Sequence, residues 1–288
     1  MTSTQTPARC AVVGNPIEHS RSPAIHQQFA AQMGVKLVYD RLLAPLDGFA
    51  LTVRNFFDAG GRGLNVTVPF KLEAWELAGA NLSPRASLAQ AVNTLWQDKE
   101  GALHGCNTDG VGLVLDLQRL GALNAGSRVL LIGAGGAARG VLGPLLDAGC
   151  ATLHLVNRTA TRAHELIAQH QATSSTASHR LTAGGLQEVG EPRSWDLVIN
   201  ASSSSLGGEA PAVASELYAK NAWAYDMMYG ATTTPFMLQA QRDGAGNTSD
   251  GLGMLVGQAA ESFYIWHGMR PDIAPVLTNL RAVLSNAR

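Results

Sequence analysis

The sequence predicts an α/β protein with two domains, and three observations predict it. Its 288 residues are long for one compact core and sufficient for two. Short apolar runs alternate with helical stretches, which indicates parallel strands joined by crossover helices. The 31 glycines gather largely in short clusters between apolar runs, as the tight turns of such a fold require.

The first domain is expected over residues 1–108, with a mostly parallel sheet. Runs rich in apolar and β-branched residues predict its strands. These are Cys10–Val13, Leu37–Leu43, Leu64–Val68 and Val92–Trp96. Stretches of helical periodicity between them predict helices over Pro23–Met33, Leu46–Ala59 and from Phe70 to Ala78.

The second domain is expected over residues 109–250, where a second alternating series begins. Its predicted helices are Val111–Leu120, Ala137–Ala148 and Ala160–His170. Its predicted strands are Arg128–Ile132, Leu153–Val156, Trp195–Asn200 and Ala222–Met227. We expect a ligand-binding cleft between the two domains.

Residues 251–288 predict two C-terminal helices, Leu252–Trp266 and Pro275–Asn286. Their periodicity leaves open which domain they pack on. Gln258, Glu261 and Ser262 interrupt the apolar run of the first helix. This pattern indicates a buried amphipathic helix and not a membrane span.

Charge and cysteine content narrow the class of partner. With 21 basic and 22 acidic residues the net charge is −1, so no electrostatic footprint for nucleic acid or anionic membrane is present. Cys10, Cys106 and Cys150 match no metal-ligand spacing. Residues 1–9 lack the apolar stretch of a signal peptide. We therefore expect reduced thiols, a cytoplasmic location and a small-molecule partner, and no metal. A homodimer is one assembly that the sequence leaves open.

A glycine motif follows a predicted strand and opens a predicted helix, the context that a G-x-G-x-x-G/A fingerprint requires. Gly133 permits the sharp turn, Gly135 allows close backbone approach to a pyrophosphate, and Ala138 allows close packing of helix on strand. The helix N-terminus adds free N–H groups and a positive dipole end. The motif predicts a Rossmann-like dinucleotide domain, although a glycine-rich turn that binds nothing would also fit it.

The end of the next predicted strand indicates which dinucleotide is bound. An Asp or Glu there would accept a hydrogen bond from the ribose 2′-OH of NAD. Here Asn157, Arg158 and Thr159 stand in its place, with Arg162 four residues after Arg158. Two guanidinium groups on one helix face suit a 2′-phosphate, which predicts NADP. The alternative is a solvated helix start capped by Thr159.

Candidate substrate residues occur mainly in the first domain. Ser20 and Ser22 precede a predicted helix, where they could bind a carboxylate, although this segment by itself favours Ser22 before Pro23 as an N-cap. Thr67 and Lys71 follow a strand, at the edge of the sheet where α/β sites form.

Three further polar residues occupy unusual positions. Asn93 lies within the apolar run Val92–Trp96, and a buried amide needs hydrogen-bond partners. Asp109 begins a helix and is also a candidate cap. Gln258 is an isolated amide on an apolar helix, and Tyr229 follows a strand of the second domain.

Taken together, these segments resemble the NADP-dependent form of the shikimate dehydrogenase family. The resemblance runs from Val13 to about Pro275 and includes, in order, several motif segments. These are Gly14–Pro16 with His19–Pro23, Asn65–Lys71, Ala91–Thr94, Asn107–Gly112, Gly133–Arg139, Asn157–Arg162, Tyr225–Tyr229 and Asp250–Gln258. Pro84 and Ser202 depart from the family pattern, away from the expected chemistry.

The resemblance implies roles for these residues. Substrate contacts are implied for Ser20, Ser22, Thr67, Lys71, Asn93, Asp109, Tyr229 and Gln258. Cofactor contacts are implied for Gly133, Ala134, Gly135, Gly136, Ala137, Asn157, Arg158, Thr159, Arg162, Met227 and Gly251. It also implies that the C-terminal helices pack on the substrate domain.

The expected reaction is reversible reduction of 3-dehydroshikimate to shikimate, a step towards chorismate and the aromatic amino acids. Lys71 is the candidate general acid, and a carboxylate at Asp109 would favour its charged ammonium and fix its direction. Two alternatives remain at this point. The first is a quinate/shikimate dehydrogenase with broader substrate and cofactor use, and the second is a catalytically silent NADP-binding regulator.

Overall fold

A computed structural model describes residues 6–173 and 180–286 of the chain. Most of the N-terminal stretch in which no signal peptide was expected lies outside these residues. The chain divides into two compact units, residues 1–112 with 256–278 and residues 113–255 with 279–288. The boundaries between them fall inside three helices. These are α5 (Asp109–Leu120), α9 (Leu252–His267) and α10 (Ile273–Asn286).

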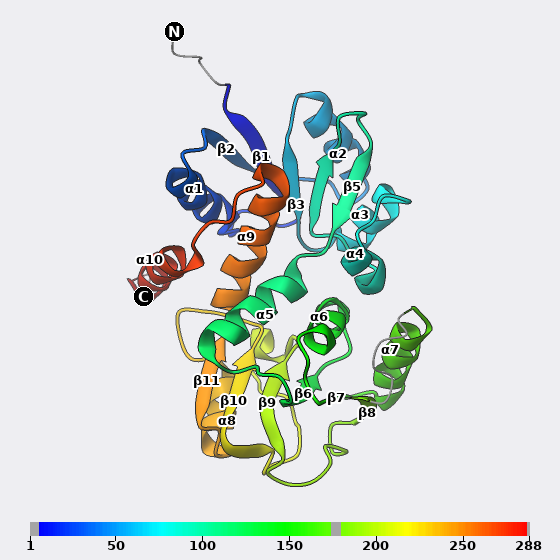
Figure 1. The fold of residues 1–288 in the computed structure, drawn as a ribbon, viewed down its shortest axis with the longest axis vertical. Helices are drawn as coiled ribbons and strands as arrows, with labels where there is room; N and C mark the ends of the chain where they lie inside the picture. The colour runs from blue at the N-terminus through cyan, green and yellow to red at the C-terminus, as the bar shows by residue number, and fades with distance from the viewer. Residues whose placement is uncertain (1–5, 174–179, 287–288) are drawn as a thin grey trace. The chain divides into compact units, whose positions relative to one another are not determined.

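The first unit contains a five-stranded sheet in the order β2-β1-β3-β4-β5 (Figure 1). Its strands are β1 (Ala8–Gly14), β2 (Leu37–Leu43), β3 (Gly63–Val66), β4 (Thr94–Gln97) and β5 (Leu103–Cys106). Its other helices are α1 (Ser22–Met33), α2 (Phe49–Asp58), α3 (Lys71–Ala78) and α4 (Pro84–Ala89).

Alternation along β1 explains how this sheet is covered on both faces. Successive side chains of a strand point to opposite faces. Cys10 and Val12 pack with Trp266 of α9, whereas Ala11 and Val13 belong to the cluster formed with α2 and α3. From Cys10 onward the strand is therefore apolar at every position, as a strand buried on both faces must be.

The predicted parallel pairing is wrong at β4. β1, β2 and β3 are parallel, but β4 runs antiparallel to both β3 and β5. The short connection around Gly101, whose φ is +83°, joins β4 and β5 as a hairpin and leaves no crossover. Asn93, expected inside this strand, precedes it and lies in the segment that leads from α4 into the sheet.

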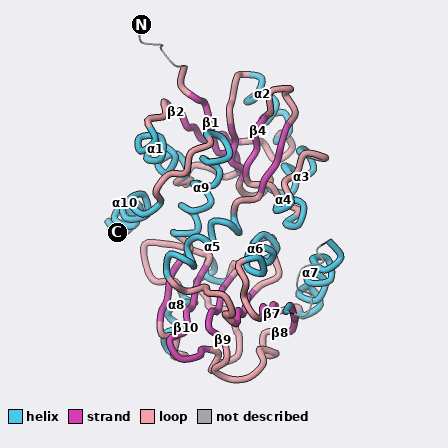
Figure 2. Tube along the Cα trace, in the orientation of Figure 1, coloured by secondary structure: helices cyan, strands magenta, loops and turns pink. Residues whose placement is uncertain are grey.

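The second unit contains a parallel six-stranded sheet in the order β11-β10-β9-β6-β7-β8 (Figure 1). Figure 2 shows the strands in magenta and the helices in cyan. Its strands are β6 (Arg128–Ile132), β7 (Thr152–Asn157), β8 (Leu181–Gly185), β9 (Trp195–Asn200), β10 (Tyr218–Asp226) and β11 (Asn247–Asp250). Its helices are α6 (Gly136–Asp147), α7 (Ala160–Thr173) and α8 (Pro235–Arg242), with a short 3₁₀ turn, η2 (Ser204–Gly207). This arrangement is the predicted Rossmann-like sheet.

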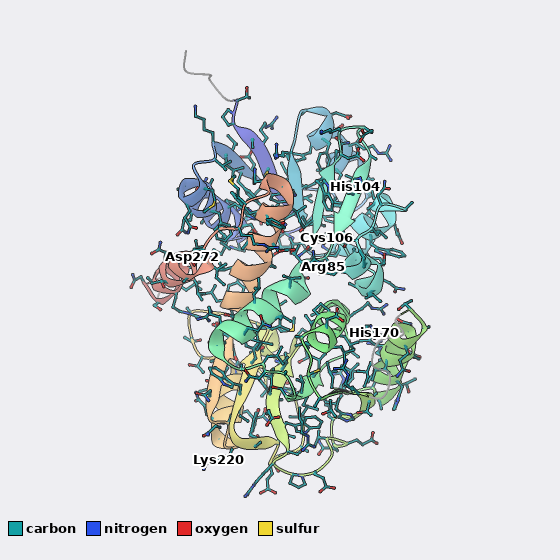
Figure 3. The ribbon with its side chains drawn as sticks, viewed as in Figure 1. Arg85, His104, Cys106, His170, Lys220 and Asp272 are labelled. Atoms are coloured by element: carbon teal, nitrogen blue, oxygen red, sulfur yellow. The ribbon has the colours of Figure 1, made fainter. Side chains whose placement is uncertain are left out.

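Two apolar clusters cover the faces of this second sheet. Val129 and Leu131 of β6 pack with α5 and α6, while Leu130 and Ile132 pack with Phe236 of α8. The three cysteines are buried free thiols; Cys106 is labelled in Figure 3. Among the described helices, none combines the length and apolar character needed to cross a bilayer.

Candidate functional site

Lys71 and Asp109 meet at the carboxyl end of β3 in the first unit. The ammonium Nζ of Lys71 lies 2.5 Å from Oδ2 of Asp109. Each residue is the first of a helix, Lys71 of α3 and Asp109 of α5. Their side chains are 32% and 17% exposed, so the pair is shielded but still reachable by a ligand. The predicted pairing of these two groups is present.

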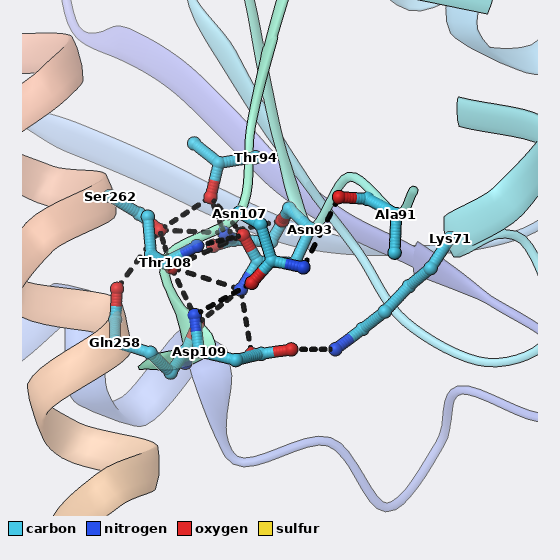
Figure 4. A network of polar contacts seen from close by, with 10 residues as sticks. Lys71, Ala91, Asn93, Thr94, Asn107, Thr108, Asp109, Gln258 and Ser262 are labelled. Carbon is cyan, nitrogen blue, oxygen red and sulfur yellow. Dashed lines mark hydrogen bonds and ion pairs between the residues drawn. The ribbon is translucent and has the colours of Figure 1, made fainter. Parts of the chain in front are cut away.

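The second carboxylate oxygen of Asp109 is held by Asn93. Nδ2 of Asn93 donates to Oδ1 of Asp109 over 2.8 Å and also to Thr108 Oγ1 over 2.9 Å (Figure 4). The carboxylate therefore does not cap its own helix; one oxygen faces the Lys71 ammonium and the other an amide. This charged, hydrogen-bonded arrangement fixes the direction of the carboxylate.

The orientation of the Asn93 amide is fixed by a backbone group. The N–H of Thr108 donates to Oδ1 of Asn93 over 2.9 Å, and a backbone N–H can only donate. The Thr94 hydroxyl lies 2.9 Å from the same oxygen. A flipped amide would present its NH₂ group to these donors and its oxygen to Asp109, so only one orientation is stable.

A buried layer of polar groups supports Asn93 from behind. Asn65 donates through Nδ2 to Asn93 O at 3.1 Å and to Ser262 Oγ at 3.0 Å, and it accepts from the Tyr39 hydroxyl at 2.7 Å. Burial raises the pKa of Tyr39 well above its ordinary value, so the phenol remains a neutral donor. Gln258 completes the layer, with Oε1 at 3.3 Å from Nδ2 of Asn93.

Thr67 lies directly after β3, two residues after Asn65 of this network. Its backbone N–H donates to Val13 O over 3.0 Å, and its methyl group fills the space where a side chain at Gly14 would lie. Among the described residues, the Thr67 hydroxyl has no hydrogen-bond partner. It is therefore free to bind a ligand hydroxyl.

Ser20 and Ser22 lie at the start of α1. The expectation that Ser22 caps this helix is wrong: Ser22 is its first residue, and the preceding Arg21 makes no side-chain cap. Instead, Ser20 Oγ accepts from the backbone N–H of Ser22 over 3.3 Å. Arg41 of β2, which sequence reasoning missed, donates through Nε and Nη2 to Ser20 O at 3.1 and 2.6 Å. Arg41 thus anchors the loop that carries Ser20 and leads into Ser22.

The glycine turn of the second unit has two kinds of glycine. Gly133 has φ +107°, and a Cβ there would lie 3.0 Å from the backbone nitrogen of Ser202, so this position needs glycine for the fold itself. At Gly135 and Gly136 a Cβ would meet no heavy atom within 4 Å. The fold itself therefore gives no steric reason for glycine at these two positions. Close approach of a phosphate to the backbone would give such a reason.

The predicted adenosine-phosphate residues lie beside this turn. Asn157 Oδ1 accepts from the backbone N–H of Ala134 over 3.2 Å, which connects the end of β7 to the glycine turn. Arg158, Thr159 and Arg162 are exposed. Within residues 6–173 and 180–286, neither arginine forms an ion pair, so both guanidinium groups are available to an anion.

The remaining predicted residues also lie in the second unit, on two adjacent loops. Gly251 N donates to Met228 O over 3.0 Å, and a side chain at Gly251 would overlap Met227. Met227 and Tyr229 follow β10, and each is partly buried. A residue outside the sequence predictions, Arg281 of α10, binds the carboxylate of Asp250 beside these loops.

Another carboxylate of the first unit, which does not belong to the predicted site, is buried. Glu261 of α9 is 6% exposed and accepts from Arg85 of α4 over 3.0 Å and from Arg270 over 2.9 Å. Arg85 is labelled in Figure 3. The pair joins α4 to α9, the helix that carries Gln258. Its position indicates a structural role.

The first unit therefore holds an ammonium–carboxylate pair, a fixed amide and a free hydroxyl close to one sheet edge. Such a set can bind a polyhydroxylated ring and supply or remove one proton at an oxygen. The second unit holds a phosphate-type turn with two free guanidinium groups. These are the parts needed by a dinucleotide-dependent enzyme acting on a small hydroxylated molecule.

Comparison with known families agrees with this assignment. Residues 12–95 match the shikimate dehydrogenase substrate binding domain. Residues 117–205 match the shikimate / quinate 5-dehydrogenase family, and residues 251–281 match the shikimate 5'-dehydrogenase C-terminal domain. The matched segments fall in both units and in the C-terminal helices.

Individual relatives are similar over nearly their whole length. A shikimate dehydrogenase (NADP(+)) of Bordetella petrii is 63% identical over 276 residues, 96% of each chain. One of Cupriavidus necator is 54% identical and covers 100% of this chain and 99% of its own. A solved shikimate 5-dehydrogenase of Thermus thermophilus, in complex with NADP(H) and shikimate, has a TM-score of 0.83 and 32% identity over 96% of this chain and 100% of its own. The chain belongs to the shikimate dehydrogenase family.

Proposed function

We propose that this protein catalyses the reversible, NADPH-dependent reduction of 3-dehydroshikimate to shikimate. The observation that carries the proposal is the Lys71–Asp109 pair, 2.5 Å apart at a sheet edge, in a chain with 63% identity to a shikimate dehydrogenase. Reduction of a ketone needs a hydride at carbon and a proton at oxygen. When bound, NADPH supplies the hydride, and the protein must orient the substrate and supply the proton.

Lys71 is the proposed general acid. Its ammonium can give a proton to the ketone oxygen during reduction, and its amine can accept one from the hydroxyl in the reverse direction. The Asp109 carboxylate directs that proton and stabilises the ammonium by a charge-assisted hydrogen bond. Asn93 holds the carboxylate in this direction through its other oxygen.

The other polar residues are proposed to bind the substrate. Thr67 and Gln258 offer a hydroxyl and an amide to the ring hydroxyls. Ser20, Ser22 and Tyr229 are proposed to bind the carboxylate, which hydroxyl donors and a helix N-terminus favour. Because Lys71 and Asp109 are only partly exposed, bound substrate would exclude further water from the pair and strengthen its electrostatics.

The glycine turn and the arginine pair are proposed to hold NADP. The N–H groups at the start of α6, from Gly135 to Ala137, would face the pyrophosphate. Arg158 and Arg162 would bind the 2′-phosphate, with Asn157 and Thr159 beside them. Met227 and Gly251 would lie against the nicotinamide. The open space at Gly135 and Gly136 supports the fit of a phosphate there.

Alanine substitutions in the glycine turn should separate folding from cofactor binding. Gly133→Ala should lower the free energy of unfolding by about 1–3 kcal/mol, because alanine is strained at this φ. Gly135→Ala should fold normally, since its methyl group meets no protein atom, but should weaken NADPH binding by occupying the phosphate position. Urea unfolding and NADPH fluorescence titration measure the two effects. Normal NADPH affinity in Gly135→Ala would contradict the proposed position of the pyrophosphate.

Removal of both arginines should change cofactor preference. Arg158→Ala/Arg162→Ala should raise KM for NADP⁺ by about 100-fold or more, since each of the two charged hydrogen-bonded contacts contributes roughly 1.5–3 kcal/mol. KM for NAD⁺ should change little, because NAD⁺ lacks the 2′-phosphate. Initial rates with both cofactors test this, with Arg193→Ala as a control at an arginine that is 73% exposed and paired with Glu216. An equal change for both cofactors would place the 2′-phosphate elsewhere.

One set of assays distinguishes the competing functions. Purified protein is mixed with NADPH or NADH and with 3-dehydroshikimate, and the absorbance of NADPH or NADH is followed; shikimate and quinate are then compared as substrates for oxidation. Comparable turnover of quinate, or of NADH, would favour a quinate/shikimate dehydrogenase. Because a solved 5-ketofructose reductase is 28% identical with a TM-score of 0.85, 5-ketofructose belongs in the same series. NADPH binding without turnover of any substrate would favour the silent regulator.

We also propose that the protein acts in the cytoplasm, which its three buried free thiols support. The homodimer that the sequence leaves open is tested by size-exclusion chromatography with light scattering.

A further inference from the structure

One guanidinium group in the second unit connects three segments that are distant in sequence. Arg281 of α10 donates through Nη1 to Oδ2 of Asp250 over 2.8 Å and through Nη2 to Oδ1 of the same carboxylate. Nη1 also lies 3.5 Å from the carbonyl oxygen of Gly230. Arg281 thus contacts the end of β11 and the loop after β10 at once. The bidentate contact with a carboxylate is the strong, directional kind of ion pair.

Asp250 is placed so that this contact matters. The residue is 6% exposed, so its carboxylate depends on its partners for stabilisation. Oδ1 also accepts from the backbone N–H of Leu252 over 3.2 Å, which fixes the turn into α9. Gly251 lies between these two residues. The Asp250 carboxylate therefore spans Gly251 and restrains its conformation.

The two loops are also bonded to each other. Gly251 N donates to Met228 O over 3.0 Å, and Gly251 is packed so closely on Met227 that a side chain would overlap it. On the strand side, Asp226 Oδ1 accepts from Met228 N over 3.1 Å and from Asn200 Nδ2 over 3.1 Å. The loops over residues 226–230 and 250–252 therefore form one packed group. Arg281 contacts this group at Asp250 and Gly230, and Asp226 contacts it at Met228.

We propose that Arg281 is a positioning residue, which fixes from the C-terminal helix the two loops that carry Met227, Tyr229 and Gly251. The inference rests on the proposed function, in which these loops contact the nicotinamide and the substrate carboxylate. Arg281 itself is not proposed to contact either ligand. It acts through Asp250 and through the carbonyl of Gly230, and its hydrogen bonds to Asp250 raise its pKa, so it stays charged at any pH of assay.

The main test is Arg281→Ala in the full-length protein. Without Arg281, the loops over residues 226–230 and 250–252 would no longer hold the nicotinamide and the substrate carboxylate in the correct position. We therefore expect kcat to fall by about tenfold or more and KM for shikimate to rise by a similar factor. KM for NADP⁺ should change by less than about twofold, because the phosphate contacts lie on other segments. The deuterium isotope effect with 4-deuterated NADPH should increase, because hydride transfer becomes the slower step.

A double variant separates positioning from stability. Arg281→Ala alone leaves a buried carboxylate without its cation, which should lower the melting temperature. Asp250→Asn/Arg281→Ala removes the charge together with its partner and should restore most of that loss. If Arg281 is only structural, the double variant regains wild-type kcat and KM. If Arg281 positions the loops, the double variant regains stability but not kcat, and Arg281→Lys, which keeps one charged contact, is intermediate in kcat.

The controls keep the outcomes distinct. Arg193→Ala removes an exposed arginine from the same unit and should leave every kinetic constant unchanged. Absence of turnover by the wild-type protein would refute the proposed function itself. An active wild type with wild-type kcat, KM for shikimate and isotope effect in Arg281→Ala would refute the positioning role alone.

Discussion

Replacement of Lys71 by alanine is expected to lower kcat by about two orders of magnitude or more while KM for 3-dehydroshikimate changes little. The lysine ammonium is the only cation within salt-bridge distance of Asp109 among the described residues, so its loss removes both the proton donor and the partner of the carboxylate. KM should change little because most of the ground-state binding of the substrate is expected to come from the hydroxyl and amide groups that contact its ring. Steady-state rates over a range of pH measure the effect.

Two further measurements test whether the loss is one of acid–base chemistry. Small primary amines added to Lys71→Ala should restore part of kcat, since alanine leaves space for an amine beside Asp109 and the amine can carry the missing proton. Lys36→Ala, at an exposed lysine, is the control and should behave as wild type with or without amine. A near-normal kcat in Lys71→Ala would remove Lys71 from the acid–base role.

The elements that the sequence predicted best are those with strong local signals. β2, β6 and β9 have the predicted bounds, because each is rich in apolar, aromatic or β-branched residues. The glycine turn was recognisable because strand, glycines and helix occur in one order. Weakly apolar elements such as β8, β11 and α4 were missed. Their short or polar sequences, such as Asn247–Asp250, acquire a regular conformation only from their neighbours.

The antiparallel direction of β4 could not be read from local pattern. A strand of four residues has the same alternation in either direction, and the choice depends on the hairpin with β5, which sequence analysis did not detect. The same holds for Ser22: its Pro23 neighbour favours an N-cap locally, but the helix starts one residue earlier because the Ser20 hydroxyl accepts from its backbone N–H. Tertiary context decided the direction of β4, and a local side-chain hydrogen bond accompanies the earlier start of α1.

In the candidate site, the sequence identified the residues whose type is unusual for their position. It did not identify the residues that hydrogen-bond to them and hold them in place. Asn93 was conspicuous as an amide in an apolar run, whereas Thr94 and Ser262, which hydrogen-bond around it, are ordinary residues for a strand and a helix. Arg281 gives no sequence signal, since an arginine on an amphipathic helix is usually solvated. Its contact with Asp250 is defined only by the folded chain.

His26 should lower the stability of the protein at acidic pH, because its side chain is fully buried and would have to carry a charge there. Neither ring nitrogen has a hydrogen-bond partner among the described residues. The residue is 0% exposed. Its ring stacks on that of Tyr39, with the ring centroids 4.4 Å apart, and its centroid lies 5.3 Å from that of the Trp266 ring. Burial lowers its pKa from 6.5 to about 3, the charge of His267 acts in the same direction, and the nearby Asn65 opposes the shift.

The sign of the effect follows from the two states. Below pH 6.5 the unfolded chain binds a proton at this histidine, whereas the folded chain does so only near pH 3. Stability is therefore fully present above pH 6.5 and is lost as the pH falls towards 3, by up to about 1.4 kcal/mol for each pH unit. Between pH 7 and pH 4.5 this single group should remove roughly 2–3 kcal/mol from the free energy of unfolding.

His26→Phe tests this expectation, since phenylalanine keeps an aromatic ring against Tyr39 and removes both nitrogens. Urea unfolding at pH 7 and pH 4.5 should show a smaller loss of stability on acidification in His26→Phe than in wild type. Some loss should remain, because burial also lowers the pKa of His267, to about 4. His164→Phe, at an exposed histidine of α7, is the control and should lose as much as wild type. If His26→Phe lost as much free energy of unfolding on acidification as the control, His26 would not be a buried neutral group whose protonation destabilises the protein.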